Sequence, residues 1–510
     1  MKKIAIIGGG LSGLSAGIFG LKAGYETVIY EKNAGIGGCC YAWKRGDYTI
    51  DNCFHWLMGT KPGTKQNDFW QEIGALSDDT PIHHRQAFYT SELDGKRLTL
   101  WRDLERTKRE LLEHSPEDEE EINRFIDCVF TCQTVLDSAQ GTFDLKAVLS
   151  DINGEVSKAA LVKTLYRYMK HNLREWSEKF KDPLIRKLIL DFQANEYEAF
   201  WLAMSYAMFT SGGADIPIGG SDEFSKRVEE HYISLGGKIF HGMEADHIEF
   251  ASQDKILAQD VASGIRFTDG SFAEADYIVC TCPITHTFTQ LLDKKYAPAA
   301  YERLEDREKN PIYSAFHVAF SVDSEMEEVD DLLYFPCEPV NVGCQVYDRI
   351  QLKNYRSFGP QIAPPGQTVV QCSFVQYPED IEMWISLRKT IDRYRELKLK
   401  TSHDILERIE TRFPEYKGKI HFLDSWTPAT YERYLNTSIG MYMRYITTPL
   451  SADAIVPQDL PNVKNVFIAG HVLTYPGGTP MAAYSGKHVI SKIENAEKTL
   501  LGKIPIIHKG

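Results

Sequence analysis

The start of the chain carries apolar and small residues in an order that predicts strand, helix, strand. Residues 3–7 are an uninterrupted apolar run, typical of a strand buried on both faces of a parallel sheet. Residues 11–24 carry small side chains at helical spacing and end at a glycine, which predicts a helix pressed closely against that sheet. A second apolar strand is predicted at 27–32. The chain therefore begins with a βαβ unit.

The pattern changes further along the chain. Residues 61–214 are rich in Glu, Lys, Leu, Tyr and Trp at helical spacing, which predicts a mainly helical insertion. Strand-like runs then return, together with one long charged helix near 378–412. A chain of 510 residues is too long for a single core. The pattern predicts an α/β protein with three parts: a discontinuous Rossmann-type domain (1–60, 215–290 and 455–500), the helical insertion (61–214), and an α+β, β-rich substrate-binding domain (291–454).

Composition narrows the possible partners. A net charge of −14 argues against nucleic-acid binding, which requires a basic surface. The chain has no apolar run of about 18 residues, the length that predicts a membrane span. Glycines interrupt the first apolar run too early for a signal peptide. The ten cysteines lack zinc-ligand spacing, so we expect reduced thiols, no metal site and a cytoplasmic protein.

One stretch departs from the acidic average. Residues 158–187 contain nine Lys and Arg against three Asp and Glu. Such a run is typical of a solvated helical face. It is also the composition of a surface that meets an anionic membrane, where an apolar substrate would be delivered. Both interpretations stay open at the level of sequence.

The turn after the first strand carries the clearest chemical motif. Gly8-x-Gly10-x-x-Gly13 follows a strand and opens a helix, and Glu31 ends the next strand 18 residues after Gly13. Gly8 permits the tight turn, Gly10 admits a pyrophosphate, and Gly13 allows close helix packing. The helix N-terminus offers free N–H groups to phosphate, and Glu31 can accept hydrogen bonds from ribose hydroxyls. This motif predicts a dinucleotide site.

FAD is favoured over NAD because a second bare stretch of backbone, Gly37-Gly38, follows Glu31. The motif Glu-x5-Gly-Gly, followed by residues 46–51, resembles the amine-oxidase-like FAD superfamily. More narrowly, the chain resembles the phytoene desaturase and carotenoid isomerase branch, which includes retinol saturase-like enzymes. Further matching segments are Pro217-x-Gly-Gly220, Gly236-Gly237-Lys-Ile, 427–434, and Ala469-Gly470 through Ser485-Gly486. The resemblance covers nearly the whole chain and implies a GR2-like flavoprotein fold.

The resemblance also implies which residues contact FAD. Ala245 would meet the adenine through its backbone, and Gly470 and His471 would lie near the pyrophosphate and ribityl. Thr479, Pro480 and Met481 would face the isoalloxazine, with Pro480 as the first residue of a helix whose positive end stabilises the reduced ring. The full expected set is Gly8, Gly10, Leu11, Ser12, Gly13, Glu31, Lys32, Gly37, Gly38, Cys39, Ala245, Gly470, His471, Thr479, Pro480 and Met481.

This sequence departs from the family pattern at two places. Cys39 and Cys40 stand where the family commonly has arginine, and His471 stands where many members have an acid. A cysteine close to a flavin raises the alternative of covalent attachment, against the expected non-covalent FAD. The other interpretation of these thiols is simple burial as small side chains.

Three residues are candidates for the chemistry. His55 belongs to a segment, 51–56, that should pass the flavin ring, and it is either a proton-transfer residue or a structural histidine. Tyr475 precedes the flavin-facing turn and can donate a hydrogen bond, and Arg444 can hold a carboxylate. Asp51 is expected to be structural. Candidate aromatic residues for a substrate tunnel, which core packing would explain equally, are Trp56, Tyr197, Trp201, Tyr206 and Phe209.

These observations predict an FAD-dependent oxidoreductase that acts on carbon–carbon bonds of a hydrophobic polyene, isoprenoid or fatty-acyl substrate. Desaturation, saturation and cis/trans isomerisation all remain open, as does transient NAD(P)H binding as reductant. One alternative is a flavin amine oxidase that acts on a C–N bond. Another is a flavin-bearing lipid-binding or interaction protein. The sequence leaves the oligomeric state undetermined.

Overall fold

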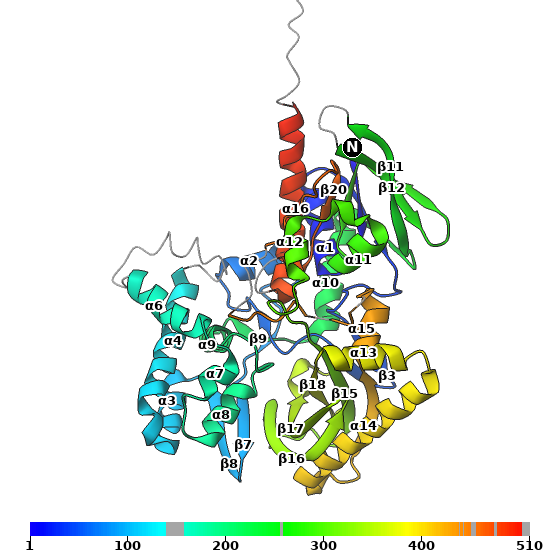
Figure 1. Cartoon of the computed structure of the whole chain (residues 1–510). Coiled ribbons are helices and arrows are strands. Elements are labelled where there is room, and N and C mark those ends of the chain that lie inside the picture. Colours follow the sequence, from blue (N-terminus) through cyan, green and yellow to red (C-terminus); the bar gives the residue numbers. More distant parts are fainter. Residues whose placement is uncertain are drawn as a thin grey trace, which may run out of the picture.

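The computed structural model describes residues 1–138, 158–254, 259–437, 439–441, 443–449, 455–473 and 477–501. Its chain forms an α/β protein with a nucleotide-binding part, a helical part and a part built on a large sheet (Figure 1). The nucleotide-binding part combines the start, the middle and the end of the chain. The predicted fold class is confirmed.

A five-stranded parallel sheet forms the centre of the nucleotide-binding part. Its buried, β-branched strands pair in register, with Ile4 opposite both Thr27 and Tyr277. Helices α1 (Leu11–Lys22) and α16 (Gly478–Leu501) pack against each other, although they lie at opposite ends of the chain. The strand order is β10 (Lys238–His241), β2 (Glu26–Glu31), β1 (Lys3–Ile7), β14 (Tyr277–Cys280) and β20 (Val466–Ile468).

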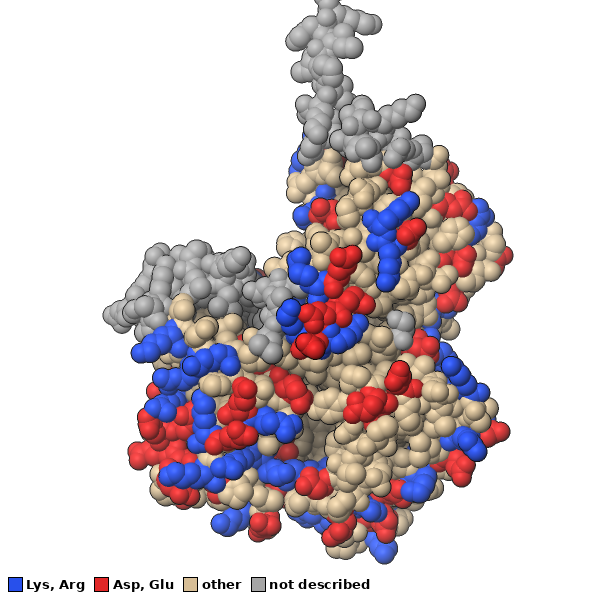
Figure 2. Space-filling view, viewed as in Figure 1, with Lys and Arg blue, Asp and Glu red and all other residues tan. Residues whose placement is uncertain are grey.

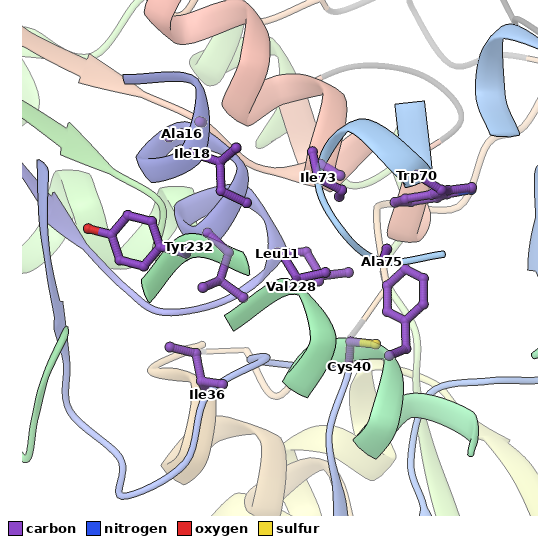
Figure 3. Packing of buried hydrophobic residues seen from close by; sticks show 14 of the residues in the cluster. Leu11, Ala16, Ile18, Ile36, Cys40, Trp70, Ile73, Ala75, Val228 and Tyr232 are labelled. Carbon is purple, nitrogen blue, oxygen red and sulfur yellow. The ribbon is translucent and has the colours of Figure 1, made fainter. Parts of the chain in front are cut away.

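Small residues allow helix α10 (Gly220–Ser234) to pack closely on α1. In Figure 3 the side chains of Val228 and Tyr232 from α10 meet Leu11 and Ile18 from α1 in one apolar cluster. A Cβ atom at Gly17 would lie 2.5 Å from the ring of Tyr232, so only glycine fits there. On the sheet side of α1, a Cβ atom at Gly20 would lie 2.6 Å from the side chain of Thr27 in β2, as expected for a helix that packs closely on the sheet.

The second large sheet has seven strands and carries helices α13 (Pro378–Leu387) and α14 (Ile391–Arg412). Where the sequence predicts one long helix near 378–412, the structure has two, separated at residues 388–390. The strand order is β19 (Ile420–Trp426), β15 (Ser314–Val322), β18 (Thr368–Gln376), β17 (Gln345–Asn354), β16 (Leu332–Val342), β7 (Ala87–Leu93) and β8 (Lys96–Trp101).

The helical part also contains short strands and a hairpin beside its helices. Residues 61–214 were predicted to be mainly helical, but they also contribute the hairpin β7–β8 to the edge of the seven-stranded sheet. The turn of this hairpin is Asp94-Gly95, with both residues at positive φ, which is the turn chemistry that joins two adjacent strands. Its helices are α3 (Leu104–His114), α4 (Glu119–Ser138), α6 (Lys158–Met169), α7 (Leu173–Ser177), α8 (Pro183–Leu190) and α9 (Phe200–Thr210).

Smaller elements connect these parts. An antiparallel sheet, β11 (Ala245–Asp254), β12 (Gln259–Phe267) and β13 (Phe272–Glu274), lies beside the parallel sheet, and Asp269-Gly270 forms the β12–β13 turn. The remaining strands are β3 (Ala42–Arg45), β4 (Tyr48–Asp51), β5 (Leu57–Met58), β6 (Ile82–His83) and β9 (Ala214–Pro217). The remaining helices are α2 (Lys65–Glu72), α11 (Ile284–His286), α12 (Ala299–Leu304) and α15 (Pro428–Leu435).

Within the described residues, the helices that reach 18 residues are too polar to cross a membrane. The same part of the chain contains no grouping of three or more His, Cys, Asp or Glu side chains that could hold a metal ion.

A buried carboxylate joins the first and middle segments of the nucleotide-binding part. Asp51, at the end of β4, accepts hydrogen bonds from the backbone N–H groups of Cys53 (2.9 Å) and Phe54 (3.0 Å). It also accepts from the N–H and hydroxyl of Ser221 in α10, both at 2.7 Å. The carboxylate therefore satisfies four donors inside the protein, which agrees with the structural role expected for Asp51.

Asp51→Ala should lower the free energy of unfolding by about 2–4 kcal/mol, because buried donors lose their acceptor. Urea denaturation of the purified protein measures this loss. Ser221→Ala, which removes one donor but leaves the carboxylate in place, serves as the control and should cost about 1 kcal/mol. Equal, small effects of the two substitutions would contradict a joining role for Asp51.

Candidate functional site

The carboxyl ends of the parallel strands open into one continuous cavity of about 390 Å³. It is lined at one end by residues that follow β1, β2 and β14, and at the other by residues of the helical part and the seven-stranded sheet. Ligands of open α/β sheets bind at this edge. Predicted residues that line the cavity are Gly8, Gly10, Leu11, Ser12, Glu31, Lys32, Gly37, Gly38, Cys39, His55, Ala245, Gly470, His471, Thr479 and Pro480.

Bare backbone forms the first wall of the cavity. Gly8 has a φ of +106°, and a Cβ atom at Gly13 would lie 2.0 Å from the Gly8 carbonyl oxygen. Gly13 therefore holds the turn closed and does not itself line the cavity. Gly10 forms a bridge with Gly37, whose N–H donates to the Gly9 carbonyl (2.8 Å). Two glycine-rich segments thus lie side by side, leaving backbone exposed to a pyrophosphate.

Glu31 fixes the same turn from the end of β2. Its Oε2 atom accepts a hydrogen bond from the N–H of Gly9 (2.7 Å), and its Oε1 atom accepts two from Asn33 (2.8 Å each). The Oε2 atom retains a further lone pair, and Glu31 lines the cavity. This geometry suits acceptance of a hydrogen bond from a ribose hydroxyl.

Lys32 and Ala245 complete the nucleotide end. Burial lowers the pKa of Lys32, and its ammonium group donates to the carbonyl of Arg433 (2.7 Å) and to the side chain of Asn436. Ala245 begins β11 and lines the cavity, as expected for a backbone contact.

Helix α16 points its N-terminus at the middle of the cavity. The helix begins at Gly478, two residues earlier than predicted, so that Pro480 lies in its first turn, where its missing N–H breaks no helical hydrogen bond. Gly478, Thr479 and Pro480 all line the cavity, whereas the predicted contact Met481 is absent from its lining. The positive end of the helix dipole therefore faces the cavity.

His471 and Arg444 lie behind this segment. Burial, followed by the charge of Arg444, lowers the pKa of His471 to about 4. Arg444 is buried and is not part of the lining, so the structure does not place it where it would hold a substrate carboxylate. The prediction for Tyr475 lies outside the described residues.

The far end of the cavity is apolar. Of the five aromatic residues suggested for a tunnel, Trp56 lines it, whereas Trp201, Tyr206 and Phe209 are buried in the core beside it and Tyr197 packs against that core. Sequence spacing cannot separate the two roles, because both place aromatic side chains on the inward face of a helix. The apolar and aromatic lining here comprises Trp56, Leu57, Met58, Tyr89, Phe192, Leu332, Tyr334 and Met443.

Positive charge surrounds the wall near His55. Burial, followed by the charges of Lys353, His317 and Arg85, holds the pKa of His55 well below its usual range. Lys353 is buried on β17, donates to the carbonyl of Phe54, and has its pKa lowered to about 7 by burial. Arg85 is also buried, and burial lowers its pKa to about 10. The resulting field favours negative charge and disfavours a cation.

His317 shares this wall. It lies on β15, lines the cavity and stacks on Trp426, with ring centroids 4.8 Å apart. Burial lowers its pKa to about 3. The sequence did not single out His317, Lys353 or Arg85, because each lies in an ordinary strand or loop pattern that carries no motif. The seven-stranded sheet positions His317 and Lys353 near His55, and the segment between β6 and β7 positions Arg85.

The lining residues of the described chain include two carboxylates, Glu31 and Glu244, and both lie at the nucleotide end with Lys32. The glycine-rich walls, the ribose-facing acid and the helix N-terminus fit FAD. Fold and site together define an FAD-dependent oxidoreductase.

The chain belongs to the family described as flavin containing amine oxidoreductases, whose model matches residues 11–489. It is 23% identical to a 4,4'-diaponeurosporene oxygenase of Staphylococcus aureus, across 97% of this chain and 99% of that protein. Among solved structures, an oxidoreductase from Methanosarcina mazei has a TM-score of 0.58 at 17% identity, covering 96% of this chain and 100% of that one. A putrescine oxidase variant has a TM-score of 0.60 at 14% identity, covering 97% and 99%.

Glu31→Ala should weaken FAD binding by about tenfold or more, because it removes a charged acceptor and frees the N–H of Gly9. Quenching of flavin fluorescence on adding FAD to the apoprotein measures the dissociation constant. Glu26→Ala removes an exposed acid from the other end of the same strand and should leave that constant unchanged. If both variants bind FAD like the parent protein, Glu31 has no such role.

Stability should fall between pH 6.5 and pH 3 because His317 stays neutral in the folded protein while the unfolded chain takes up a proton. The contribution is complete above pH 6.5, and its loss reaches at most about 1.4 kcal/mol per pH unit. His317→Gln should make the free energy of unfolding less pH-dependent by about that slope, whereas the exposed His403→Gln should not. Unchanged slopes in urea denaturation series would contradict the burial of a neutral His317.

Proposed function

We propose that this FAD-dependent oxidoreductase acts on carbon–carbon bonds of a hydrophobic polyene, by desaturation, saturation or isomerisation. The observation that carries the proposal is the apolar end of the cavity, whose residues line the same cavity as Thr479 and Pro480. An elongated apolar substrate would lie against Tyr89 and Leu332. Trp56 and Met58 would line its path toward the flavin end of the cavity. Burial of such a chain supplies binding free energy in proportion to its apolar area.

The relatives support a polyene over other lipids. The match covers nearly the full length of the Staphylococcus aureus protein named above. The substrate in the name of that protein is a carotenoid polyene. At 23% identity this supports the chemical class of substrate rather than one compound. A broader isoprenoid or fatty-acyl substrate would fit the same apolar wall.

An amine substrate fits the charges of the cavity less well. Putrescine oxidase has the same fold, but the wall of this cavity at His55 has Lys353 and Arg85 buried close by. The lining carboxylates of the described chain lie at the nucleotide end, away from that wall. Asp51, Asp331 and Asp215 interact with these cations but do not line the cavity, so a substrate ammonium would find no lining carboxylate at this wall. This electrostatic arrangement favours carbon–carbon chemistry over oxidation of a C–N bond.

FAD, when bound, supplies hydride acceptance or donation. The protein must bind the polyene, exclude water and handle a proton. We assign the proton transfer to His55, because it lines the cavity and its lowered pKa keeps the ring neutral, so that it would relay a proton rather than hold one. Arg444 would act through His471 rather than on the substrate, and Tyr475 would donate a hydrogen bond.

The cysteines support non-covalent FAD. Burial raises the pKa of Cys39 to about 12 and that of Cys40 well above its usual range. Both thiols are therefore protonated and weak nucleophiles at neutral pH. Transient NAD(P)H remains the proposed source of electrons for saturation or for a reduced-flavin isomerase.

His55→Gln should lower turnover of the polyene by about 100-fold while leaving the flavin absorption band intact, because it removes a proton-transfer group and not the FAD site. The matched control His403→Gln changes an exposed histidine and should retain full turnover. Turnover is followed by chromatography of the extracted product. Full activity of His55→Gln would overturn the assignment of proton transfer to this residue.

The substrate class is tested by parallel incubations of the holoenzyme. Polyenes with and without added NADH or NADPH are analysed for a change of two mass units or of double-bond geometry, and diamines are assayed for peroxide release. A polyene product without peroxide from amines supports the proposal. Peroxide from amines without any change in polyenes overturns it in favour of an amine oxidase.

A further inference from the structure

The helical part has a second hollow, distinct from the FAD cavity. Its lining is Glu121 and Arg124 from α4, Arg167 from α6, Lys170 and His171 just after α6, and Lys179 just after α7. It thus gathers four permanent cations and a histidine around a single carboxylate. Its cations fall largely within the basic stretch 158–187, which the proposed redox function does not use.

The single carboxylate of this hollow is already engaged. Glu121 pairs with Arg124 (2.9 Å) and accepts a hydrogen bond from the indole of Trp176 (3.3 Å), and Arg124 also pairs with Glu120. Among the described residues, no carboxylate lies within ion-pair distance of Arg167, Lys170 or Lys179. Within the described part of the chain these three cations therefore form no ion pair, and Glu121 is the carboxylate that acts on Lys179 from a longer distance.

Mutual repulsion is visible in the titrating groups. Burial and the neighbouring cations Lys170, Arg167 and Arg124 lower the pKa of Lys179, although Glu121 opposes them. Burial, followed by Lys179, lowers the pKa of His171. An anion in the hollow would relieve this repulsion. Because arginine offers a planar fork of donors and lysine a compact charge, the set suits the oxygens of a phosphate group.

Exposed apolar side chains on the two helices that line the hollow indicate where that phosphate comes from. On α6, Val162 and Tyr166 are one helical turn apart, with 46% and 64% of their surface exposed, and Lys170 follows one turn later. Phe130 of the neighbouring helix α4 is 65% exposed. Exposed aromatic and aliphatic side chains next to Lys and Arg are typical of helices that lie in a membrane interface.

We propose that this α4–α6 surface docks on an anionic membrane, with a phospholipid phosphate in the hollow and Phe130, Val162 and Tyr166 in the headgroup layer. Figure 2 shows Lys and Arg side chains gathered at the α6 end of the helical part. The rest of this acidic protein would be repelled by such a membrane, so the basic surface sets its orientation.

The same helical core connects this surface with the FAD cavity. Leu165 and Tyr168 of α6 belong to one apolar cluster with Tyr89, Phe192 and Leu332, which line the far end of the cavity. Docking through α6 would therefore bring the membrane against the same part of the protein that forms the apolar end of the cavity. A water-insoluble substrate is available there.

Co-sedimentation of the holoenzyme with vesicles tests the docking. The parent protein should bind vesicles that contain phosphatidylglycerol, bind pure phosphatidylcholine vesicles far more weakly, and lose binding as salt is raised. Arg167→Glu with Lys170→Glu should reduce binding by at least about tenfold, since each basic residue contributes about fivefold. Arg393→Glu with Arg395→Glu on the exposed face of α14 makes the same charge change elsewhere and should leave binding unchanged.

Two further measurements keep the outcome clear. If flavin absorption shows that the charge-reversed double variant is misfolded, the neutral double variant Arg167→Gln with Lys170→Gln is used in its place. This neutral variant should also lose vesicle binding. Calorimetry with inorganic phosphate tests whether the hollow binds free phosphate rather than the phosphate of a phospholipid headgroup. Phosphate binding without vesicle binding, equal binding of all variants, or equal binding to neutral vesicles would each overturn membrane docking.

Discussion

The approach of Gly13 to the carbonyl oxygen of Gly8 is the contact on which the rest of the site depends. A methyl group there would come within 2.0 Å of that oxygen, so the turn closes only with glycine. The closed turn lets α1 meet α16, where the hydroxyls of Ser12 and Ser15 donate to the carbonyls of Ala482 (2.9 Å) and Ala483 (2.7 Å). Two segments almost 470 residues apart thereby form one cavity wall. The N-terminus of α16 faces the flavin end for the same reason.

Charge divides the cavity into two ends with different chemistry. Glu31 and Glu244 stand with Lys32 at the nucleotide end, where an adenosine ribose can be held. Near His55, by contrast, Lys353 and Arg85 are buried among aromatic rings and without a lining carboxylate. Asp51, Asp331 and Asp215 interact with these two cations, but none of the three carboxylates lines the cavity, so this wall disfavours a cationic substrate. The apolar lining beyond it then selects a long hydrophobic molecule.

The sequence predicted those features of the site that depend on the local conformation of the backbone. The glycine-rich turn, the acid at the end of β2 and the Gly37-Gly38 segment carry their function in residue type and spacing, and the structure places them around one cavity. The β7–β8 hairpin was missed because its strands join a sheet whose other members lie more than 200 residues away. His317 and Lys353 were missed for a related reason, since only strand pairing brings them to His55. The charge of Arg444 made it a plausible residue to hold a substrate carboxylate, but its burial behind His471 could not be inferred from sequence spacing.

The central claim is that one cavity holds FAD along the glycine-rich turn and a polyene against the wall formed by Tyr89, Phe192 and Leu332. Experimental structure determination of the holoenzyme with a bound polyene tests it most directly. The account predicts density for the adenosine at Glu31, for the isoalloxazine at Thr479 and Pro480, and for the polyene in the apolar end beside His55. Density for the polyene outside this cavity, or for the flavin away from the N-terminus of α16, would contradict the account.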